Sequence, residues 1–472
     1  MREMPLNRRG TTDIHVAHCV GFYFPQTVGG TEVYVHDLTT ELSRRSIRNS
    51  IIAATDRDFE RYDWEGIPIL RYPSNWADLR EYASTSQRAG LSKFQELILK
   101  IDPDIFHLHS WTTGAGLRHL VQVAQLGIPC VVTMHVPSAL CLRGTMLLKG
   151  EQPCDGRIDE KRCGQCWAMS HGLPEPLAFG LSRLPRLAVG RGWRTNVSRR
   201  MATVLSVRSL VKGQADDLQT MASLCDRIVA PSQWVHSALT ANAVPSQKLV
   251  ISRQAVAPSL VDQGSRKRQK TTSGELRIGF VGRLEHYKGA HILLEAMARI
   301  PASIPLRLLV VGSGTDLEYL GKLEAMANED KRIEFLGAMP HDRLSEFLEQ
   351  IDVLAVPSNY METGPLVVLE AYAFGIPVMG ANIGGIAERI RDGIDGWLLP
   401  FNDSQAWAAA MQEAALNRDK VARLVGNILP SRTMADVASD MASLYREILE
   451  AKAGSELGAA KTAGAASASE AG

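Results

Sequence analysis

Glu362 and Glu370 are two carboxylates whose type and spacing suggest chemistry, with seven residues between them. The apolar, β-branched residues 351–356 precede them and predict a buried strand. Pro365 suits the first position of a helix, and Gly375 suits the end of one. The segment therefore predicts a strand, a loop and a helix whose N-terminus opens onto the loop. Free N–H groups and the positive end of a helix dipole at such a place favour a phosphate-bearing ligand.

Glu370 lies among the apolar residues of the predicted helix. A carboxylate is costly to bury there without partners, so we expect it to meet hydroxyl groups or a cation. Taken alone, the residue is explained equally well as a glutamate on the one solvent-exposed edge of a core helix. Residue type does not decide between these two interpretations.

Two cations occupy a second loop of the same kind. Residues 276–281 predict a strand, and the loop over 282–289 leads from it into a predicted helix over 290–299. Within that loop Arg283 offers a planar fork of donors and Lys288 offers a point charge. Both suit a diphosphate at the N-terminus of a helix.

Gly29 and Gly30 form a further candidate for phosphate contact. They separate a predicted strand over 13–20 from a helical pattern that runs to Leu42. Glycines between a strand and a helix allow the backbone to come close to a phosphate. A glycine pair alone is more often only a turn.

Two histidines, His109 and His135, close the predicted strands over 105–109 and 130–135, and His107 lies within the first of these strands. Alternating strands and helices predict a parallel sheet, which binds ligands at the carboxyl ends of its strands. A single histidine is more often a hydrogen-bonded structural residue. His107 and His109 alternate along one strand and therefore face the same side. We assign these two to the acceptor side of the expected cleft.

The paired glutamates on a strand, loop and helix resemble the motif of the retaining nucleotide-sugar glycosyltransferases of family 4, group 1. The resemblance is dense over 276–403 and sparser in the first half of the chain. It implies an α/β fold with two Rossmann-like domains facing across a cleft, the arrangement called GT-B. It also implies transfer of a sugar from a nucleoside-diphosphate donor to an acceptor with retention of configuration, in glycan, polysaccharide or glycolipid biosynthesis.

The resemblance also implies a role for each residue named above. Glu362 and His135 would orient the donor sugar, and Glu370 would bind the ribose. Arg283 and Lys288 would stabilise the leaving diphosphate. The remaining donor contacts would come from the backbone at Gly29, Gly30, Leu366 and Val367.

The chain departs from the family pattern at two places. Gly364 and Pro365 stand where the family usually has Phe-Gly. Because proline has no N–H, the expected phosphate donors move to Leu366 and Val367. Residues 252–256, Ser-Arg-Gln-Ala-Val, replace the commoner form that contains Pro-Asn-Gly.

Catalysis is expected to need no metal ion. Asp-x-Asp, the usual metal–diphosphate signature of other glycosyltransferases, occurs at 56–58 and 102–104. Both pairs lie in the first domain, away from the predicted donor loops, and are interpreted as turn residues. Arg283 and Lys288 would take the place of the metal.

Four cysteines form a cluster in an insertion over about 137–215, and the last two have the Cys-x2-Cys spacing that grips one tetrahedral ion. A segment with few apolar residues cannot build its own core, so we expect a structural zinc ion held by four thiolates. Disulfides are the poorer explanation in a reducing compartment, and an iron–sulfur cluster has no redox task here. Unliganded thiols in a loop are the alternative. The expected ligands are Cys141, Cys154, Cys163 and Cys166.

The same insertion carries a basic stretch, because residues 176–215 contain eight arginines and lysines and no acidic residue. With interleaved apolar residues, the stretch fits an amphipathic helix that meets anionic lipid headgroups or a phosphate-bearing acceptor. A solvated helical flap that pairs with acids elsewhere explains it equally well.

Composition limits the classes of function. The 472-residue chain has a formal net charge of +1, so no overall field directs it to nucleic acid. No apolar run reaches the roughly 20 residues of a membrane span, and no apolar segment follows the charged N-terminus as in a secretory signal. Seven cysteines, an odd number, argue against a disulfide framework. We expect a cytoplasmic enzyme with peripheral contact at the inner face of the membrane. Its expected partners are a UDP-, GDP- or ADP-sugar and a glycan or lipid-linked acceptor.

The patterns of strands and helices divide the chain into two domains and a tail. The polar residues 258–273 predict a solvated linker between the domains, and the Ala-, Gly- and Ser-rich C-terminus predicts disorder. The expected parts are an acceptor domain over 1–262, a donor domain over 274–430, a helix over 431–453 that crosses back to the first domain, and a disordered tail over 454–472.

Two other functions fit the same residues. A nucleotide-sugar epimerase has the same fold and binds a diphosphate, and it would give epimer exchange or hydrolysis without an acceptor product. A non-catalytic sugar-nucleotide sensor would bind tightly without turnover. Four intact donor-site side chains argue against the sensor: Arg283, Lys288, Glu362 and Glu370.

Overall fold

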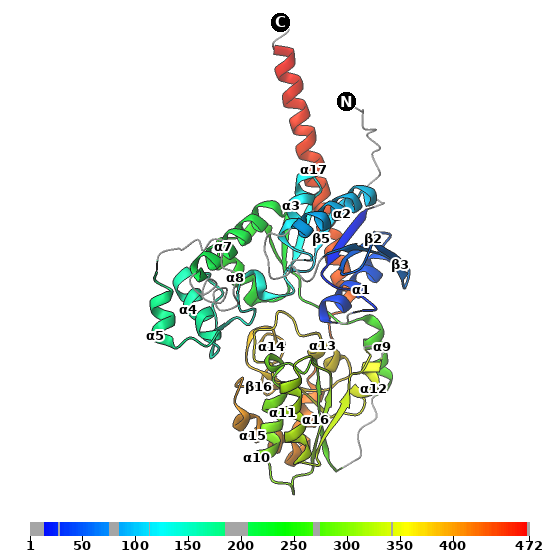
Figure 1. The fold of residues 1–472 in the computed structure, drawn as a ribbon. Helices are drawn as coiled ribbons and strands as arrows, with labels where there is room; N and C mark the ends of the chain where they lie inside the picture. The colour runs from blue at the N-terminus through cyan, green and yellow to red at the C-terminus, as the bar shows by residue number, and fades with distance from the viewer. Residues whose placement is uncertain are drawn as a thin grey trace.

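The computed structural model describes residues 14–26, 29–74, 85–112, 114–184, 206–267, 274–340 and 343–469, and of residues 85–90, 265–267 and 456–469 it describes the backbone. Within these residues the chain builds two large sheets, one in each half (Figure 1). Both sheets are predominantly parallel and have helices on their faces. This confirms the predicted fold class of two Rossmann-like domains.

The first sheet has eight strands in the order β10-β9-β6-β5-β1-β2-β4-β3. Its central strands are buried apolar runs, which is typical of a parallel sheet covered on both faces. The sequence analysis did not predict β3, an edge strand that pairs antiparallel with β4. The strands are β1 (His15–Val20), β2 (Arg48–Thr55), β3 (Glu60–Trp64), β4 (Ile67–Pro73), β5 (Ile105–Leu108), β6 (Cys130–Thr133), β9 (Arg227–Ala230) and β10 (Leu249–Ile251). The helices beside them are α1 (Gly30–Ser43), α2 (Thr85–Ile101), α3 (Leu117–Gln125), α7 (Val207–Leu224) and α8 (Gln233–Ala241).

The insertion follows β6 and lies to one side of the first domain (Figure 1). Its described part has a short 3-10 turn, a two-stranded ribbon and two helices, of which the first packs on both the second and α7. Residues 185–205, which hold most of the basic stretch, lie outside the described residues. Its elements are the turn Pro137–Ala139, β7 (Leu147–Leu148), β8 (Gln152–Pro153), α4 (Glu160–Ser170) and α5 (Glu175–Leu181).

The second sheet has six parallel strands in the order β13-β12-β11-β14-β15-β16. The order reverses between β11 and β14, and parallel sheets bind ligands at the carboxyl ends of such neighbours. The strands are β11 (Leu276–Val281), β12 (Leu306–Val311), β13 (Ile333–Gly337), β14 (Val353–Val356), β15 (Val378–Ala381) and β16 (Gly396–Leu399). The helices are α10 (Ala290–Arg299), α11 (Leu317–Asn328), α12 (Leu344–Leu348), α13 (Leu366–Ala373), α14 (Gly384–Ala387), α15 (Ser404–Leu416) and α16 (Arg418–Gly426).

Two segments differ from the sequence prediction. The expected linker over 258–273 begins as a helix, α9 (Pro258–Lys267), because Leu260 is buried and Gly264 packs so closely on α13 that a Cβ atom would overlap the carbonyl oxygen of Ala373. The expected disordered tail is helical as far as Ser469, since α17 runs over Met434–Ser469. The alanine-rich composition that suggested disorder also has high helix propensity.

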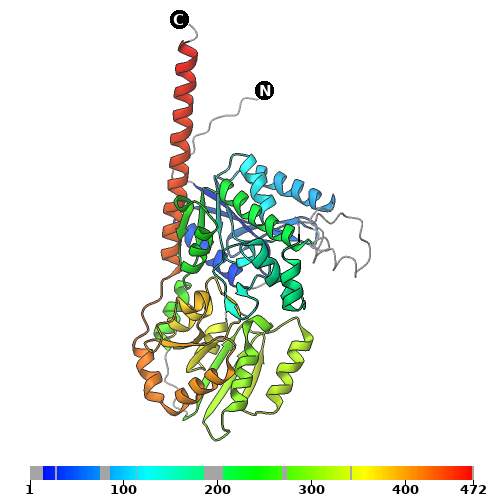
Figure 2. The same ribbon diagram turned by 90° about the vertical axis from the view of Figure 1, so that its left-hand side faces the viewer.

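α17 returns to the first domain and packs against α1 (Figure 2). Its buried face, which includes Met441 and Tyr445, shares one apolar core with β1 and β2. Just before it, Thr433 pairs with Val256, so the two chain segments that cross between the domains lie side by side. Two backbone hydrogen bonds hold them, from Val256 N to Arg432 O (3.1 Å) and from Met434 N to Val256 O (2.9 Å). None of the helices in the described parts of the chain combines the length and the apolar composition that a membrane crossing requires.

Candidate functional site

Lys288 and Glu362 form an ion pair between the loops that follow β11 and β14, at the reversal point of the second sheet. Lys288 Nζ lies 2.9 Å from Glu362 Oε1 and 3.1 Å from the Tyr360 hydroxyl. Ser358 Oγ donates to the same carboxylate oxygen at 2.6 Å. Burial would raise the pKa of Glu362, but Lys288 and these hydrogen bonds outweigh it and hold that pKa below its usual value. The carboxylate is therefore ionised and its direction is fixed.

Backbone contacts bring the two loops together. Gly289 has a φ of 77°, and a Cβ atom there would overlap the carbonyl oxygen of Pro357. Asn359 N donates to Tyr287 O at 2.7 Å. Only glycine combines this left-handed conformation with so close an approach. The Lys-Gly sequence thus carries both the cation and the backbone turn that places it.

Arg283 is exposed and lies at the same edge, with its guanidinium carbon 5.5 Å from the centre of the Tyr287 ring. Across the cleft it faces the start of α1, where it interacts electrostatically with Glu32. Burial raises the pKa of Glu32, opposed by hydrogen bonds from the Glu32 and Gly29 N–H groups and by Arg283. The Glu32 carboxylate thus already binds N–H groups of the glycine loop that the sequence assigns to a diphosphate.

The N-termini of α1 and α13 face each other across the cleft. A Cβ atom at Gly30 would lie 3.8 Å from Leu366 Cδ1, so residues of the two domains almost touch there. Pro365 precedes α13, which leaves Leu366 and Val367 as its first N–H donors. Glu370 lies one turn further along α13 and is 6% exposed.

His135 lies beside the donor loop and is buried. Its backbone oxygen accepts a hydrogen bond from Thr363 Oγ1 at 2.6 Å. Its ring nitrogens contact Gln254 Nε2 at 3.3 Å and His109 Nδ1 at 3.2 Å. Burial lowers the pKa of His135 to about 3, so the ring is neutral at physiological pH.

A second set of contacts across the cleft involves α8. Both oxygens of Glu388, from the second domain, accept backbone N–H bonds at the α8 N-terminus, from Gln233 and Trp234 at 2.7 Å each. The Trp234 indole donates to Glu362 O at 2.8 Å. The sequence analysis missed Glu388, because its partners lie more than 150 residues away in the chain and no local pattern marks them.

Comparison with known proteins supports the same division into two halves. The family model for glycosyltransferase family 4 matches residues 28–159, and the model for group 1 glycosyl transferases matches residues 262–428. The chain belongs to the GT-B glycosyltransferases of group 1 and family 4.

Curated relatives of this chain include two proteins named D-inositol 3-phosphate glycosyltransferase. The one from Corynebacterium urealyticum is 36% identical over 183 residues, which are 36% of this chain and 43% of the relative. The one from Stackebrandtia nassauensis is 32% identical over 223 residues, 44% of this chain and 50% of the relative. The chain thus spans half or less of the length of these relatives.

Solved structures share the fold over nearly the whole chain. Anabaena HepE in complex with UDP and glucose has a TM-score of 0.56 at 16% identity, covering 93% of this chain and 99% of that one. Sucrose-phosphate synthase from Thermosynechococcus elongatus has a TM-score of 0.60 at 18% identity, covering 93% and 100%. At these identities the likeness establishes the fold alone.

The assignment of His107 and His109 to the acceptor side is wrong. Both rings are fully buried, because β5 is an interior strand and α17 covers that face of the sheet. His107 contacts the Tyr445 hydroxyl at 2.6 Å and Thr133 Oγ1 at 2.8 Å, while His109 lies between His18 and His135. The two histidines are therefore structural.

A cavity of about 250 Å³ lies at the carboxyl ends of β1, β2 and β4 and is a better candidate for the acceptor side. Arg71 lines it, but the side chain is 1% exposed and donates to Tyr23 O at 2.8 Å and Phe24 O at 2.9 Å. The sequence analysis missed this arginine, and its only signal was a charge inside an apolar strand. The cavity is lined by Phe22, Tyr23, Gln26, Ala54, Thr55, Asp56 and Arg71.

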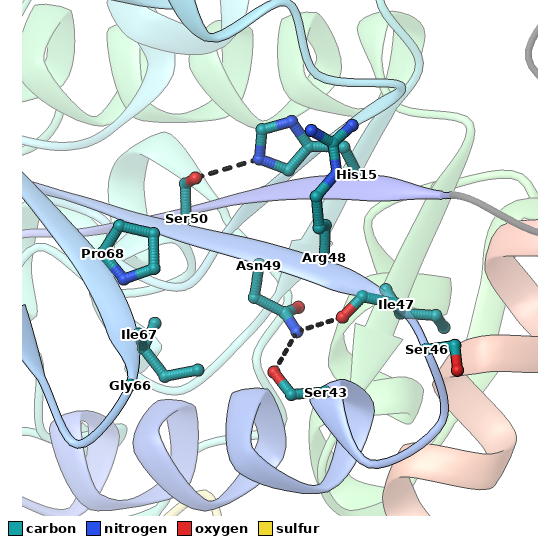
Figure 3. A pocket seen from close by; sticks show the side chains of 10 residues that line it. All are labelled: His15, Ser43, Ser46, Ile47, Arg48, Asn49, Ser50, Gly66, Ile67 and Pro68. Atoms are coloured by element: carbon teal, nitrogen blue, oxygen red, sulfur yellow. Dashed lines mark hydrogen bonds between the residues drawn. The ribbon is translucent and has the colours of Figure 1, made fainter.

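A larger cavity, of about 410 Å³, lies at the opposite edge of the same sheet (Figure 3). It is formed where β1 and β2 begin, around His15 and Arg48. Since parallel sheets bind ligands at the carboxyl ends of their strands, this cavity is not the donor site.

Three of the four cysteines of the insertion, Cys141, Cys154 and Cys163, interact electrostatically with one another, whereas Cys166 makes other contacts. Cys166 Sγ accepts hydrogen bonds from Lys149 N at 3.1 Å and Arg143 Nη1 at 3.4 Å. Burial, and to a lesser degree Cys154 and Cys141, raises the pKa of Cys163 to about 11. Within the described residues, the three side chains whose ligand atoms all lie within 4.8 Å of one another are the buried His18, His107 and His109, and not the cysteines. All seven cysteines lie in described parts of the chain, and none of them forms a disulfide. The zinc site stays a prediction.

We predict that protein purified without added metal carries one zinc ion per chain. Zinc binds cysteine as the thiolate, and serine offers no thiol, so we expect Cys163→Ser to remove the ion. Metal analysis by mass spectrometry measures both. Cys225→Ser, in a buried cysteine outside the insertion, is the control and should keep the metal. A wild-type protein without stoichiometric zinc contradicts the prediction.

Proposed function

We propose that this protein is a retaining glycosyltransferase that moves a sugar from a nucleoside-diphosphate donor to an acceptor. The observation that carries the proposal is the ion pair of the half-buried Lys288 with the buried Glu362 at the reversal point of the second sheet. The pair lies at the carboxyl edge of this sheet, opposite the start of α1. A fixed cation and a fixed carboxylate at this edge suit a ligand that has both a diphosphate and hydroxyl groups.

The proposed chemistry relies on positive charge at the leaving group. As the bond from the sugar to the diphosphate breaks, negative charge grows on the diphosphate, and Arg283 and Lys288 stabilise it. The N–H groups of Leu366 and Val367 add the positive end of α13. In this scheme the cations do the work that a metal ion does in other glycosyltransferases, so no metal is required for catalysis.

The carboxylates orient the donor in this proposal. Glu362 is held by Lys288 and Ser358 and keeps acceptor capacity for a sugar hydroxyl. Glu370, one turn into α13, binds the ribose. His135 is neutral and saturated by protein contacts on both ring nitrogens, so it positions its neighbours rather than transferring a proton.

UDP-sugars are the first donors to test, because HepE, a protein of the same fold, has been solved with UDP and with UDP-glucose. GDP- and ADP-sugars come next. The relatives named D-inositol 3-phosphate glycosyltransferase make an inositol phosphate the first acceptor to test, beside glycan and lipid-linked acceptors.

The direct test is a thermal-shift screen with UDP, GDP and ADP, followed by a turnover assay with the matching nucleotide sugar. A nucleotide that binds only the native state at 100 times its Kd stabilises it by about 2.7 kcal/mol, which is readily measured. Formation of a product with the anomeric configuration of the donor, read by NMR, is the expected result. Epimer exchange without an acceptor product would support the epimerase, and binding without turnover on any acceptor would support the sensor.

We predict that Lys288→Ala and Arg283→Ala each lower kcat/KM by roughly 100-fold or more, the usual loss when one donor to developing charge is removed. Steady-state kinetics measure the loss, and thermal melting checks the fold. Lys322→Ala is the matched control, because this lysine is 68% exposed on α11 of the same domain. Normal kcat/KM in both variants, with normal melting, would reject the assignment.

We also propose peripheral contact of the insertion with an anionic membrane. Within the basic stretch, α5 exposes Leu177 and Phe179, and Arg183 stacks on the Phe179 ring. We predict that Leu177→Glu lowers co-sedimentation with liposomes containing anionic lipid, and that added salt lowers it for the wild type. Leu416→Glu, at an equally exposed leucine of the second domain, should not change it. Indifference of the wild type to both salt and lipid charge would leave the solvated-flap interpretation.

A further inference from the structure

One buried polar atom at the cleft lacks a partner, the side-chain oxygen of Gln254. The residue is 4% exposed, and its amide nitrogen donates to His135 Nδ1 at 3.3 Å. Its Oε1 has no hydrogen-bond partner among the residues that the structure describes. Burying an acceptor without a hydrogen-bond partner destabilises a fold, so its retention calls for an explanation.

The orientation of this amide is fixed by a chain of hydrogen bonds that begins at Asn49. Figure 3 shows the Asn49 amide nitrogen between Ser43 Oγ and Ile47 O, at 3.0 and 2.8 Å, and Thr39 O lies 3.2 Å away. The two carbonyl oxygens can only accept, so this atom is the nitrogen. Asn49 Oδ1 therefore faces His18 Nε2, at 3.0 Å, and His18 Nε2 must carry the proton.

The hydrogen bond with the preceding residue of this chain then fixes the tautomer of His18, of His109 and of His135 in turn. His18 is neutral, so its Nδ1 accepts from His109 Nε2 at 3.0 Å. His109 is neutral too, and its Nδ1 accepts from His135 Nε2 at 3.2 Å. His135 Nδ1 is then an acceptor, and the atom of Gln254 that meets it is the N–H donor. The remaining Gln254 atom, which has no partner among the described residues, is therefore the carbonyl oxygen.

That oxygen points at the donor loop of the second domain. A Cβ atom at Gly364 would overlap Gln254 Oε1, so the oxygen lies over the loop backbone between Glu362 and α13. Thr363, the preceding residue, holds His135 O at 2.6 Å, and Arg389 holds Gln254 O at 3.1 Å. Both domains thus fix the place of the side chain.

We propose that Gln254 Oε1 accepts a hydrogen bond from a hydroxyl of the transferred sugar and is a specificity-determining residue of the donor site. The inference rests on the proposed function. A carbonyl oxygen can only accept, which excludes the diphosphate oxygens as its partner and requires a group that carries hydrogen. The ribose is assigned to Glu370, further along α13, whereas Gln254 adjoins Gly364 at the end of the loop that holds Glu362. The sugar of the donor is the hydroxyl-bearing part that reaches this point.

The experiment measures binding by calorimetry, without an acceptor, for wild type and Gln254→Met. The ligands are UDP, UDP-glucose and its 2-, 3-, 4- and 6-deoxy analogues. We expect the Kd of UDP to stay within about twofold and the Kd of UDP-glucose to rise about tenfold in the variant, the scale of one hydrogen bond. One deoxy analogue should bind the wild type about tenfold more weakly than UDP-glucose and lose nothing further in the variant.

Two further variants separate this role from a structural one. Gly364→Ala keeps the glutamine, but its methyl group would overlap Oε1 and displace that oxygen, so the variant should reproduce the loss for UDP-glucose and not for UDP. This variant keeps the proposal testable if Gln254→Met melts early. Gln214→Met removes a buried glutamine of α7 that donates to Ser138 O, and it should leave the ratio of the two Kd values unchanged.

The outcomes are distinct. Equal binding of UDP-glucose to wild type and both cleft variants overturns the role of Gln254 and leaves the proposed function standing. The same holds if every deoxy analogue keeps its full penalty in Gln254→Met, since the hydrogen bond would then be made elsewhere. Failure of the wild type to bind UDP or UDP-glucose overturns the proposed donor, and the role of Gln254 with it.

Discussion

The candidate site depends on burying one negative and one positive charge together. Isolated, either Glu362 or Lys288 would lose much of its hydration on entering the loops, and neither would remain charged there. Paired, each holds the other ionised, and Ser358 and Tyr360 occupy further positions around them. The pair in turn requires the loops after β11 and β14 to touch, which only the left-handed Gly289 permits. The ion pair, the contact between the two loops and Gly289 therefore depend on one another.

The second constraint is that the site is shared between domains that must also separate to exchange ligands. Hydrogen bonds join the domains at three places: Thr363 to His135, Trp234 to Glu362, and Glu388 to the start of α8. Such bonds are exchanged for water at small net cost when the cleft opens. They make the closed arrangement specific in geometry.

The sequence was most informative where a function and its structural support lie close together in the chain. The strand, loop and helix around Glu362 and the loop with Arg283 and Lys288 could be predicted because every signal falls within about twenty residues. Arrangements between distant segments could not. Nothing near His107 indicates that Tyr445, 338 residues later, covers it. The role of Glu388 could not be predicted either. It caps a helix of the other domain, and no short sequence motif contains both the carboxylate and the helix that it caps.

Two predictions that relied on the composition of a segment were wrong. The polar segment after Pro258 suggested a linker, yet one buried leucine and one glycine that fits against α13 make it a packed helix. The alanine-rich C-terminus suggested disorder, although alanine favours helices wherever a preceding turn already exists. In both cases the average polarity of a segment was less informative than a few residues in contact with a neighbouring element.

The pairing of Val256 with Thr433 has a mechanical consequence. Two bodies joined at two well-separated points cannot rotate freely, but here the two crossings are adjacent and hydrogen-bonded to each other. They act as a single pivot, which leaves the second domain one easy motion, a rotation about the paired segment, and opposes sliding along the cleft. The bonds of Glu388 to α8 form a further connection between the domains. A ligand that favours the closed form would therefore select this one rotation.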